Sequence, residues 1–112
     1  MLNKKDIIRI NQEIGENGSF SNESSLDFAL HIIKERKSWL YEIAYLTRCL
    51  LVDHVFTDGN KRTTFVLIIT YFELKDVNYD KENILNIIDK ISSKNIKDIN
   101  KIMRLVKSGI IH

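Results

Sequence analysis

The chain has 112 residues, of which 44% are hydrophobic and 29% charged, which fits one globular domain and leaves no room for a second. The formal net charge of +2 is too small to indicate a nucleic-acid-binding protein by itself, and the single cysteine, Cys49, excludes an internal disulfide. The N-terminal residues lack the apolar core of a signal peptide, and the longest purely apolar run, 65–69, is too short to span a bilayer. We therefore expect a cytoplasmic protein of one domain, residues 1–112, without a membrane-bound part.

Apolar residues recur at helical spacing along most of the chain, and the complete absence of proline leaves long helices uninterrupted. This spacing predicts helices at about residues 4–14, 24–33, 39–53, 60–74, 80–91 and 95–106. Asn3 is the expected N-cap of the first helix. Residues 15–25 are rich in Gly, Asn and Ser and are predicted to form a loop, and residues 76–79 are expected to be briefly extended.

The predicted helix that begins at Asn60 differs from the others, because it is apolar on every side between Phe65 and Leu74. A helix that is hydrophobic all round usually lies at the centre of a domain. The expected fold is therefore a compact all-α bundle of about six helices, forming a single domain around this buried central helix.

Polar and charged side chains concentrate in residues 54–64, HVFTDGNKRTT, directly before the central helix. The first turn of a helix presents unpaired N–H groups and the positive end of the helix dipole, so it binds anions. Gly59 allows a tight turn without a Cβ, and Asn60 can cap the helix or donate from its amide. Lys61 and Arg62 place two cations where the dipole disfavours them, which indicates an anionic ligand such as a phosphate.

The first half of the same loop carries different groups. Histidine side chains titrate near neutral pH, so His54 can accept a proton from a hydroxyl nucleophile. Asp58 can hold Mg²⁺ together with phosphate oxygens, and Phe56 is an apolar anchor for the loop. A base, a metal-binding acid and an anion site together predict phosphoryl or nucleotidyl transfer. Taken singly, a turn, a helix cap and surface cations each have an ordinary structural explanation, and it is their combination that favours chemistry.

The residues from His54 to Arg62 resemble the signature of the Fic/Doc family, H-x-F-x-(D/E)-(G/A)-N-(G/K)-R. The IIRINQEI segment, the SSLDFAL segment after the Gly/Ser-rich loop and the continuation NKRTT are all similar to the Doc (death-on-curing) branch. Helix order and length agree with the family across nearly the whole chain, so the resemblance implies a Fic/Doc fold over residues 1–112.

The resemblance implies a role for each residue of the motif. His54 would be the general base that deprotonates a Ser, Thr or Tyr hydroxyl of a target protein. Asp58 would bind Mg²⁺ on the phosphates of ATP or another nucleoside triphosphate, and Phe56 would hold the loop against the core. The phosphate-binding residues would be Gly59, Asn60 and Lys61, which form the anion hole, and Arg62, which contacts a terminal phosphate.

Two departures from the AMP-transferring members bear on the reaction. Those members have Gly at the position of Lys61 and a second Arg at that of Phe65. Lys61 and Phe65 are instead similar to the Doc branch, which is associated with phosphate transfer from ATP through a reversed nucleotide orientation. Gly59, in contrast, follows the AMP-transferring pattern, where Doc tends to have Ala. The resemblance therefore favours a Doc-like kinase and leaves AMP transfer open.

The resemblance also bears on control and on target docking. Ser19 to Ser24, SFSNES, matches the inhibitory-helix pattern S/T-x-x-x-E-G/N except at its last position, and an ordinary loop with a helix cap is the alternative interpretation. Without an internal inhibitor, the resemblance implies a toxin controlled by a separate antitoxin protein. Residues 31–38, HIIKERKS, are the candidate for the family's flap, which aligns the target segment by strand addition.

Two other functions remain open. A Fic-like scaffold without catalysis would be a nucleotide- or partner-binding module, although the intact His54 and Asp58 favour an enzyme. The basic C-terminal third suggests a nucleic-acid-binding protein as another hypothesis. We rank this hypothesis last, because the cations are dispersed at helical spacing without interleaved aromatic residues.

Overall fold

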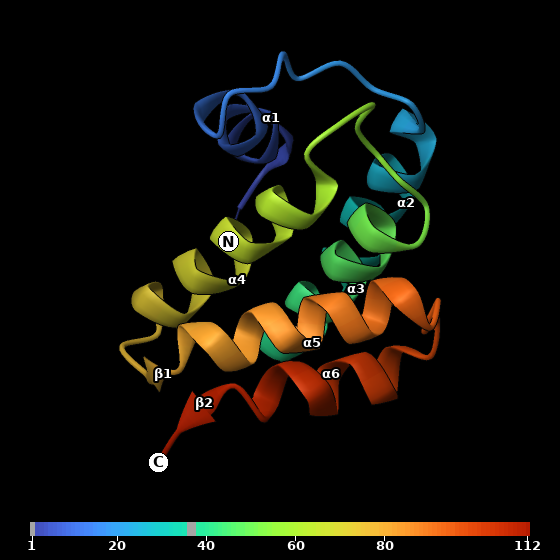
Figure 1. Cartoon of the computed structure of the whole chain (residues 1–112). Helices are drawn as coiled ribbons and strands as arrows, with labels where there is room; N and C mark the ends of the chain where they lie inside the picture. The colour runs from blue at the N-terminus through green and yellow to red at the C-terminus, as the bar shows by residue number, and fades with distance from the viewer. Residues whose placement is uncertain (1, 36–37) are drawn as a thin grey trace.

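The chain folds into a bundle of helices that pack on one another through the centre of the molecule (Figure 1). In the computed structural model, residues 2–35 and 38–112 are described. Within them the helices are α1 (Lys4–Glu13), α2 (Glu23–Ile33), α3 (Trp39–Leu51), α4 (Asn60–Leu74), α5 (Lys81–Ser93) and α6 (Ile99–Lys107). Two short strands, β1 (Asn78–Tyr79) and β2 (Ile110–Ile111), pair antiparallel. The predicted all-α, single-domain bundle is confirmed, and part of the segment 76–79 is extended as expected.

Asparagine side chains begin the first two helices. Asn3 caps α1 as predicted, because its side chain accepts from the Asp6 N–H while the Asp6 carboxylate accepts from the Asn3 N–H, each at 2.9 Å. Asn22 caps α2 by accepting from the Ser25 N–H at 3.3 Å. Helix α2 therefore begins at Glu23, slightly before its predicted start.

The predicted start of the last helix is wrong. Helix α6 begins at Ile99, four residues after the expected Asn95. Asn95 has a φ of 51°, in the left-handed region that a helix cannot contain. Asp98 is the actual N-cap, since its carboxylate accepts from the Asn100 N–H at 3.0 Å.

Helices α3 and α4 together form the centre of the core. Eight of the thirteen residues of α3 are buried, and six of the fifteen residues of α4. Helix α4 contacts α1, α3, α5 and β1, which agrees with the central position predicted for it. It is not covered on every side, because Leu74 is 63% exposed and Phe65 and Val66 are only half-buried. Helix α3, which contacts α2, α4, α5 and α6, is the more buried of the two.

The N-terminal part of the chain covers one end of the bundle. In Figure 1 the segment between α1 and α2 runs along the top of the molecule above the loop that joins α3 to α4, and backbone hydrogen bonds connect the two. Ile7 and Ile10 of α1 are buried, and α1 lies against α4. Residues 11–22 are thereby brought next to residues 53–63. None of the helices in the described part of the chain combines the length and the apolar character that crossing a membrane requires.

Candidate functional site

The candidate site comprises the loop between α3 and α4 and the first turn of α4. Gly59 is the N-cap of α4 and has a φ of 78°, a left-handed conformation that favours glycine. Its carbonyl accepts from the Thr63 N–H at 2.8 Å, which closes the first helical turn. Within the described residues, the N–H groups of residues 60–62 have no hydrogen-bond acceptor. These donors are therefore open to an anion at the positive end of α4.

Asn60 fixes the shape of the loop. Its side-chain oxygen accepts from the Phe56 N–H at 3.0 Å, and its Nδ2 donates to the Phe56 carbonyl at 2.9 Å. Both ends of the amide are thus engaged by the backbone of one residue. The helix-capping role considered for Asn60 is wrong, since Gly59 occupies the cap, and the backbone N–H of Asn60 and the second N–H of its Nδ2 are left as donors.

Residues 19–22 hold the loop from the outside. Hydrogen bonds connect the two segments: Thr57 N–H to the Ser19 carbonyl (3.0 Å), Ser21 N–H (2.8 Å) and Asn22 N–H (3.0 Å) to the Val55 carbonyl, and the Asn22 side chain to the Asp53 carbonyl (3.3 Å). At the centre of this short ladder, Phe20 and Phe56 form an antiparallel bridge. The segment predicted to be a plain loop is therefore a scaffold for the motif.

Phe56 occupies the position that an anchor requires. Its side chain is 1% exposed and stacks on Phe20, with ring centroids 5.3 Å apart and planes inclined by 14°. Burial of an aromatic side chain of this size contributes about 2–3 kcal/mol, and the stacked pair adds about 1 kcal/mol. The middle of the loop is thus fixed to the core while its two ends stay accessible.

Asn11 is the polar residue that joins the parts of the site. It is 1% exposed, and its Nδ2 donates to the Asp58 carbonyl at 3.0 Å and to the Thr63 hydroxyl at 3.1 Å. Its Oδ1 accepts from the Gly18 N–H at 2.9 Å. Asn11 is not among the site residues predicted from the sequence. The available signal was its place four residues after Ile7, which puts an amide on the apolar face of α1.

His54 and Asp58 are both exposed, and their side chains have no polar partner among the described residues. His54 has a φ of 53°, a strained backbone conformation that is often found at functional sites. No group of three or more His, Cys, Asp and Glu side chains gathers within the described residues to hold a metal ion. Asp58 therefore fits Mg²⁺ only as one ligand beside phosphate oxygens and water, which is how this ion is commonly bound.

Lys61 and Arg62 have protein partners. Lys61 Nζ lies 3.2 Å from the Asp89 carboxylate of α5, and Arg62 donates to the Ile14 carbonyl at the end of α1, at 2.5 Å. These contacts partly offset the cost of two cations at the positive end of α4 without any ligand. Both cations border a hollow of about 170 Å³, whose other lining residues include Phe65, Leu85 and Ile88.

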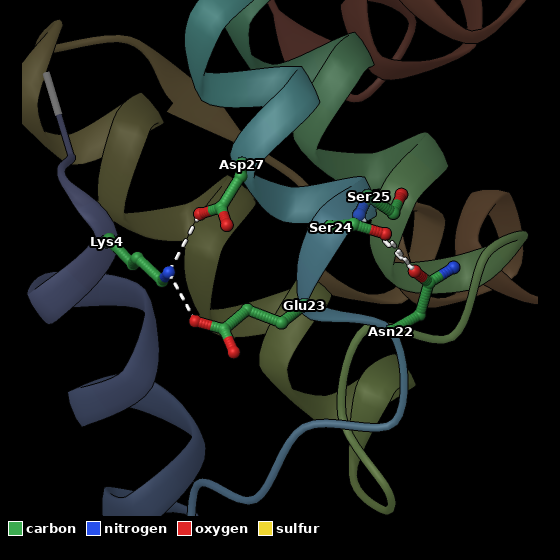
Figure 2. Close-up of polar contacts among 6 residues, drawn as sticks. All are labelled: Lys4, Asn22, Glu23, Ser24, Ser25 and Asp27. Atoms are coloured by element: carbon green, nitrogen blue, oxygen red, sulfur yellow. Dashed lines mark hydrogen bonds and ion pairs between the residues drawn. The ribbon is translucent and has the colours of Figure 1, made fainter.

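The residues that resemble an inhibitory helix form a loop and a cap. Figure 2 shows Lys4 of α1 pointing toward Glu23 and Asp27 of α2, with which it forms ion pairs at 2.6 and 2.8 Å. The side-chain oxygen of Asn22 accepts hydrogen bonds from the Ser24 hydroxyl and the Ser25 N–H in the first turn of α2. Glu23 thus pairs with Lys4 of the neighbouring helix. This arrangement is the alternative, structural interpretation of the pattern.

The candidate flap lies away from the site. Residues 31–33 form the C-terminal end of α2, and residues 36 and 37 lie outside the described residues. The opposite, N-terminal end of α2 is the one near the site, because its N-cap Asn22 donates to the Asp53 carbonyl. Since α2 is 11 residues long, its far end is about 16 Å away from the end near His54. The described part of this segment therefore does not border the site.

Comparisons with protein-family models, with curated proteins and with solved structures find no match for this chain.

Proposed function

We propose that the protein transfers a phosphate-containing group from ATP to a hydroxyl side chain of a target protein, in the manner of the Fic/Doc family. The proposal rests mainly on one observation. The exposed His54 and Asp58 lie in the loop directly before α4, and the N–H groups in the first turn of α4 have no hydrogen-bond acceptor among the described residues. One short segment thus offers a proton acceptor, a carboxylate for Mg²⁺ and donors for phosphate oxygens.

His54 is the general base in this proposal. Its imidazole takes the proton of the acceptor hydroxyl while the hydroxyl oxygen forms a bond to phosphorus, and the bond from that phosphorus to the leaving oxygen breaks. Attack at the γ-phosphorus releases ADP, and attack at the α-phosphorus releases pyrophosphate. His54 ends the step protonated, and no covalent intermediate forms on the protein.

The remaining residues of the motif bind the nucleotide. Asp58 would hold Mg²⁺ together with the phosphate oxygens, and the bound ion would neutralise part of the phosphate charge. The N–H groups of residues 60–62 donate to phosphate oxygens, and Lys61 and Arg62 exchange their present partners for phosphate. For Lys61 this exchange is inexpensive, because its exposed ion pair with Asp89 contributes only about 0–1 kcal/mol. For Arg62 it replaces a hydrogen bond to a neutral carbonyl with one to a charged phosphate. The adjacent hollow, with its apolar residues from α4 and α5, accommodates part of the nucleoside.

The choice between the two reactions follows the resemblance. Lys61 and Phe65 favour a Doc-like kinase over AMP transfer, and Gly59 keeps AMP transfer as the alternative. A toxin paired with an antitoxin protein is the corresponding biological setting, since the segment that resembles an inhibitory helix forms a loop and a helix cap, where Glu23 pairs with Lys4.

The deciding experiment incubates the full chain, Mg²⁺ and a cell lysate with ATP labelled at either the α- or the γ-phosphate. Label that reaches a protein only from the γ-position identifies a kinase, and label from the α-position identifies AMP transfer. The His54→Ala variant should abolish labelling, whereas His31→Ala, which removes an exposed histidine of α2, should not. Unchanged labelling by His54→Ala would exclude His54 as the base.

A second candidate is a nucleotide- or partner-binding module without catalysis. It is favoured by Lys61 and Arg62, whose protein partners hold these cations at the start of α4 without a phosphate. Absence of labelling from either position, together with ATP binding that persists in His54→Ala, would support this candidate.

A further inference from the structure

A polar hollow of about 630 Å³ lies on the other side of the loop, next to the residue that precedes His54. Three elements border it. Helix α2 contributes Ser24, Ser25 and Phe28, the end of α3 and the loop directly after it contribute Arg48 and Asp53 respectively, and the segment between α5 and α6 contributes Lys97. The hollow is therefore formed where the start of α2 and the end of α3 meet.

The charge of this hollow favours an acidic occupant. Neither Arg48 nor Lys97 forms an ion pair with an acid within the described residues. Arg48 makes one hydrogen bond, to the Lys97 carbonyl at 3.4 Å, which leaves most of its five N–H donors free. The carboxylate among the lining residues, Asp53, already accepts from the Ser25 hydroxyl at 2.5 Å. Arg48 also lies over the Tyr45 ring, with its Cζ 5.1 Å from the ring centroid. The lining thus has two cations without an acidic partner and one carboxylate, so positive charge is in excess.

The hollow also has an apolar part. Phe28 is 56% exposed, which is unusual for a phenylalanine on a helix that packs in the core, and Val52 beside it is half-buried. Serine hydroxyls and asparagine amides supply hydrogen-bonding groups between the aromatic ring and the cations. A peptide segment combines the acidic, apolar and backbone groups that such a surface binds, whereas a small anion would leave Phe28 without a contact.

The position of the hollow relates it to the proposed reaction. Asp53 borders the hollow, His54 follows directly, and the phosphate-binding residues 59–62 come at the other end of the loop. The hollow beside Lys61 and Arg62 shares no lining residue with the one beside Asp53. A target segment and a nucleotide can therefore bind at the same time, with His54 in the loop between the two hollows in sequence.

We propose that this polar hollow docks the segment of the target protein that carries the acceptor hydroxyl, and that it selects segments with acidic side chains beside that hydroxyl. The inference rests on the proposed function for the role of the hydroxyl. Docking itself does not require turnover, so the two can be tested separately.

The test measures binding of two short fluorescent peptides to the full-length His54→Ala protein without ATP. Both have a central serine, which is flanked by glutamates in one and by lysines in the other. The glutamate peptide should bind more tightly, and Lys97→Met and Arg48→Met should each weaken it by about threefold at low salt. Lys101→Met, an equal charge change on α6 outside the hollow, is the matched control and should leave the affinity unchanged. Amide chemical shifts of Ser24, Ser25 and Asn95 should move on titration.

The docking proposal would be overturned by equal affinity for both peptides or by an equal effect of Lys97→Met and Lys101→Met. It would also be overturned if the amide chemical shifts changed only for residues outside the hollow. Displacement of the peptide by a single-stranded RNA whose own affinity depends on Lys97 would also overturn it, with nucleic acid as the occupant. Transfer of label from ATP without any preference for acidic peptides would contradict the docking proposal alone. Selective binding without transfer would instead contradict the proposed function.

Discussion

Two buried or half-buried asparagines determine the geometry of the candidate site. The side chain of Asn60 forms two hydrogen bonds with the backbone of Phe56 and thereby closes the turn between these two residues. Asn11 ties three segments, because its amide reaches the Asp58 carbonyl, the Thr63 hydroxyl and the Gly18 N–H. An amide suits this role because it offers two donors and an acceptor without the desolvation cost of a charge.

The first prediction concerns Asn11→Asp, which keeps the shape of the side chain but replaces the two N–H donors with a carboxylate oxygen. That oxygen would face the Asp58 carbonyl in a buried position. We expect the free energy of unfolding to fall by about 3 kcal/mol, and the affinity for Mg²⁺ and ATP to fall with it, because an unpaired buried charge releases the loop. Urea unfolding and nucleotide titration measure the two effects.

Thr63→Val is the matched control for this substitution. It removes the hydroxyl partner of Asn11 but leaves the bond to the Asp58 carbonyl intact. Its cost should be about 1 kcal/mol, and nucleotide affinity should change little. A loss of nucleotide affinity as large as that of Asn11→Asp would show that the bond to the loop has no special role.

At the scale of elements, the N-terminus of α4 depends on close approach of the backbone to residues 11–16. A Cβ built on Gly59 would lie 2.7 Å from Glu16 Cγ and 3.1 Å from Ile14 Cδ1. The φ of 78° adds a conformational cost for any residue with a side chain. Gly59 is therefore needed both for its conformation and for the space that it leaves.

The second prediction is that Gly59→Ala lowers the free energy of unfolding by about 2 kcal/mol, of which about half is the cost of the left-handed conformation. The other half arises from contact with Glu16 and should be recovered in the double variant Gly59→Ala/Glu16→Ala. Thermal unfolding of both variants and of Glu16→Ala alone tests this cycle. If removal of the Glu16 side chain recovers nothing, the close approach described here is not the source of the loss.

The helices could be predicted from the sequence because their signals are local. The spacing of Ile7 and Ile10, the cap at Asn3 and the glycine before Asn60 all act within one or two turns. The motif residues of the loop, 54–62, could also be identified from the sequence, because they are consecutive. Burial of Phe56 was also expected, because it is an apolar side chain in a loop of mostly polar residues.

The parts that could not be predicted depend on contacts between distant residues. The Phe20–Phe56 bridge and the pairing of β1 with β2 join segments with no shared local pattern. The role of Asn11 is likewise visible only once Asp58 is beside it. The start of α6 was misplaced for a different reason, since Asn95 and Asp98 are both good N-caps and the isoleucine spacing continues across both.

At the scale of the whole molecule, the core holds two weak acids that a folded chain keeps protonated. Burial, with a smaller effect of Asp53, raises the pKa of the Cys49 thiol from its ordinary value of 9.0 to about 12. Burial is also the main cause that raises the pKa of Tyr71, whose hydroxyl accepts from the Leu2 N–H at 3.4 Å. Both side chains lie in the central helices α3 and α4, so ionisation of either is coupled to unfolding of the domain.

The last prediction is that the domain loses stability in mild alkali. In the unfolded chain the Cys49 thiol ionises near pH 9, whereas the folded protein holds its proton until about pH 12. The folded state therefore binds more protons than the unfolded state in this window, and the free energy of unfolding falls as pH rises above about 9. The thiol alone should account for about 1 kcal/mol between about pH 9 and pH 10. Urea unfolding followed by circular dichroism measures this loss. Cys49→Ala, which keeps a small apolar side chain, should show a smaller loss over that interval, and an equal loss in both proteins would contradict the assignment to Cys49.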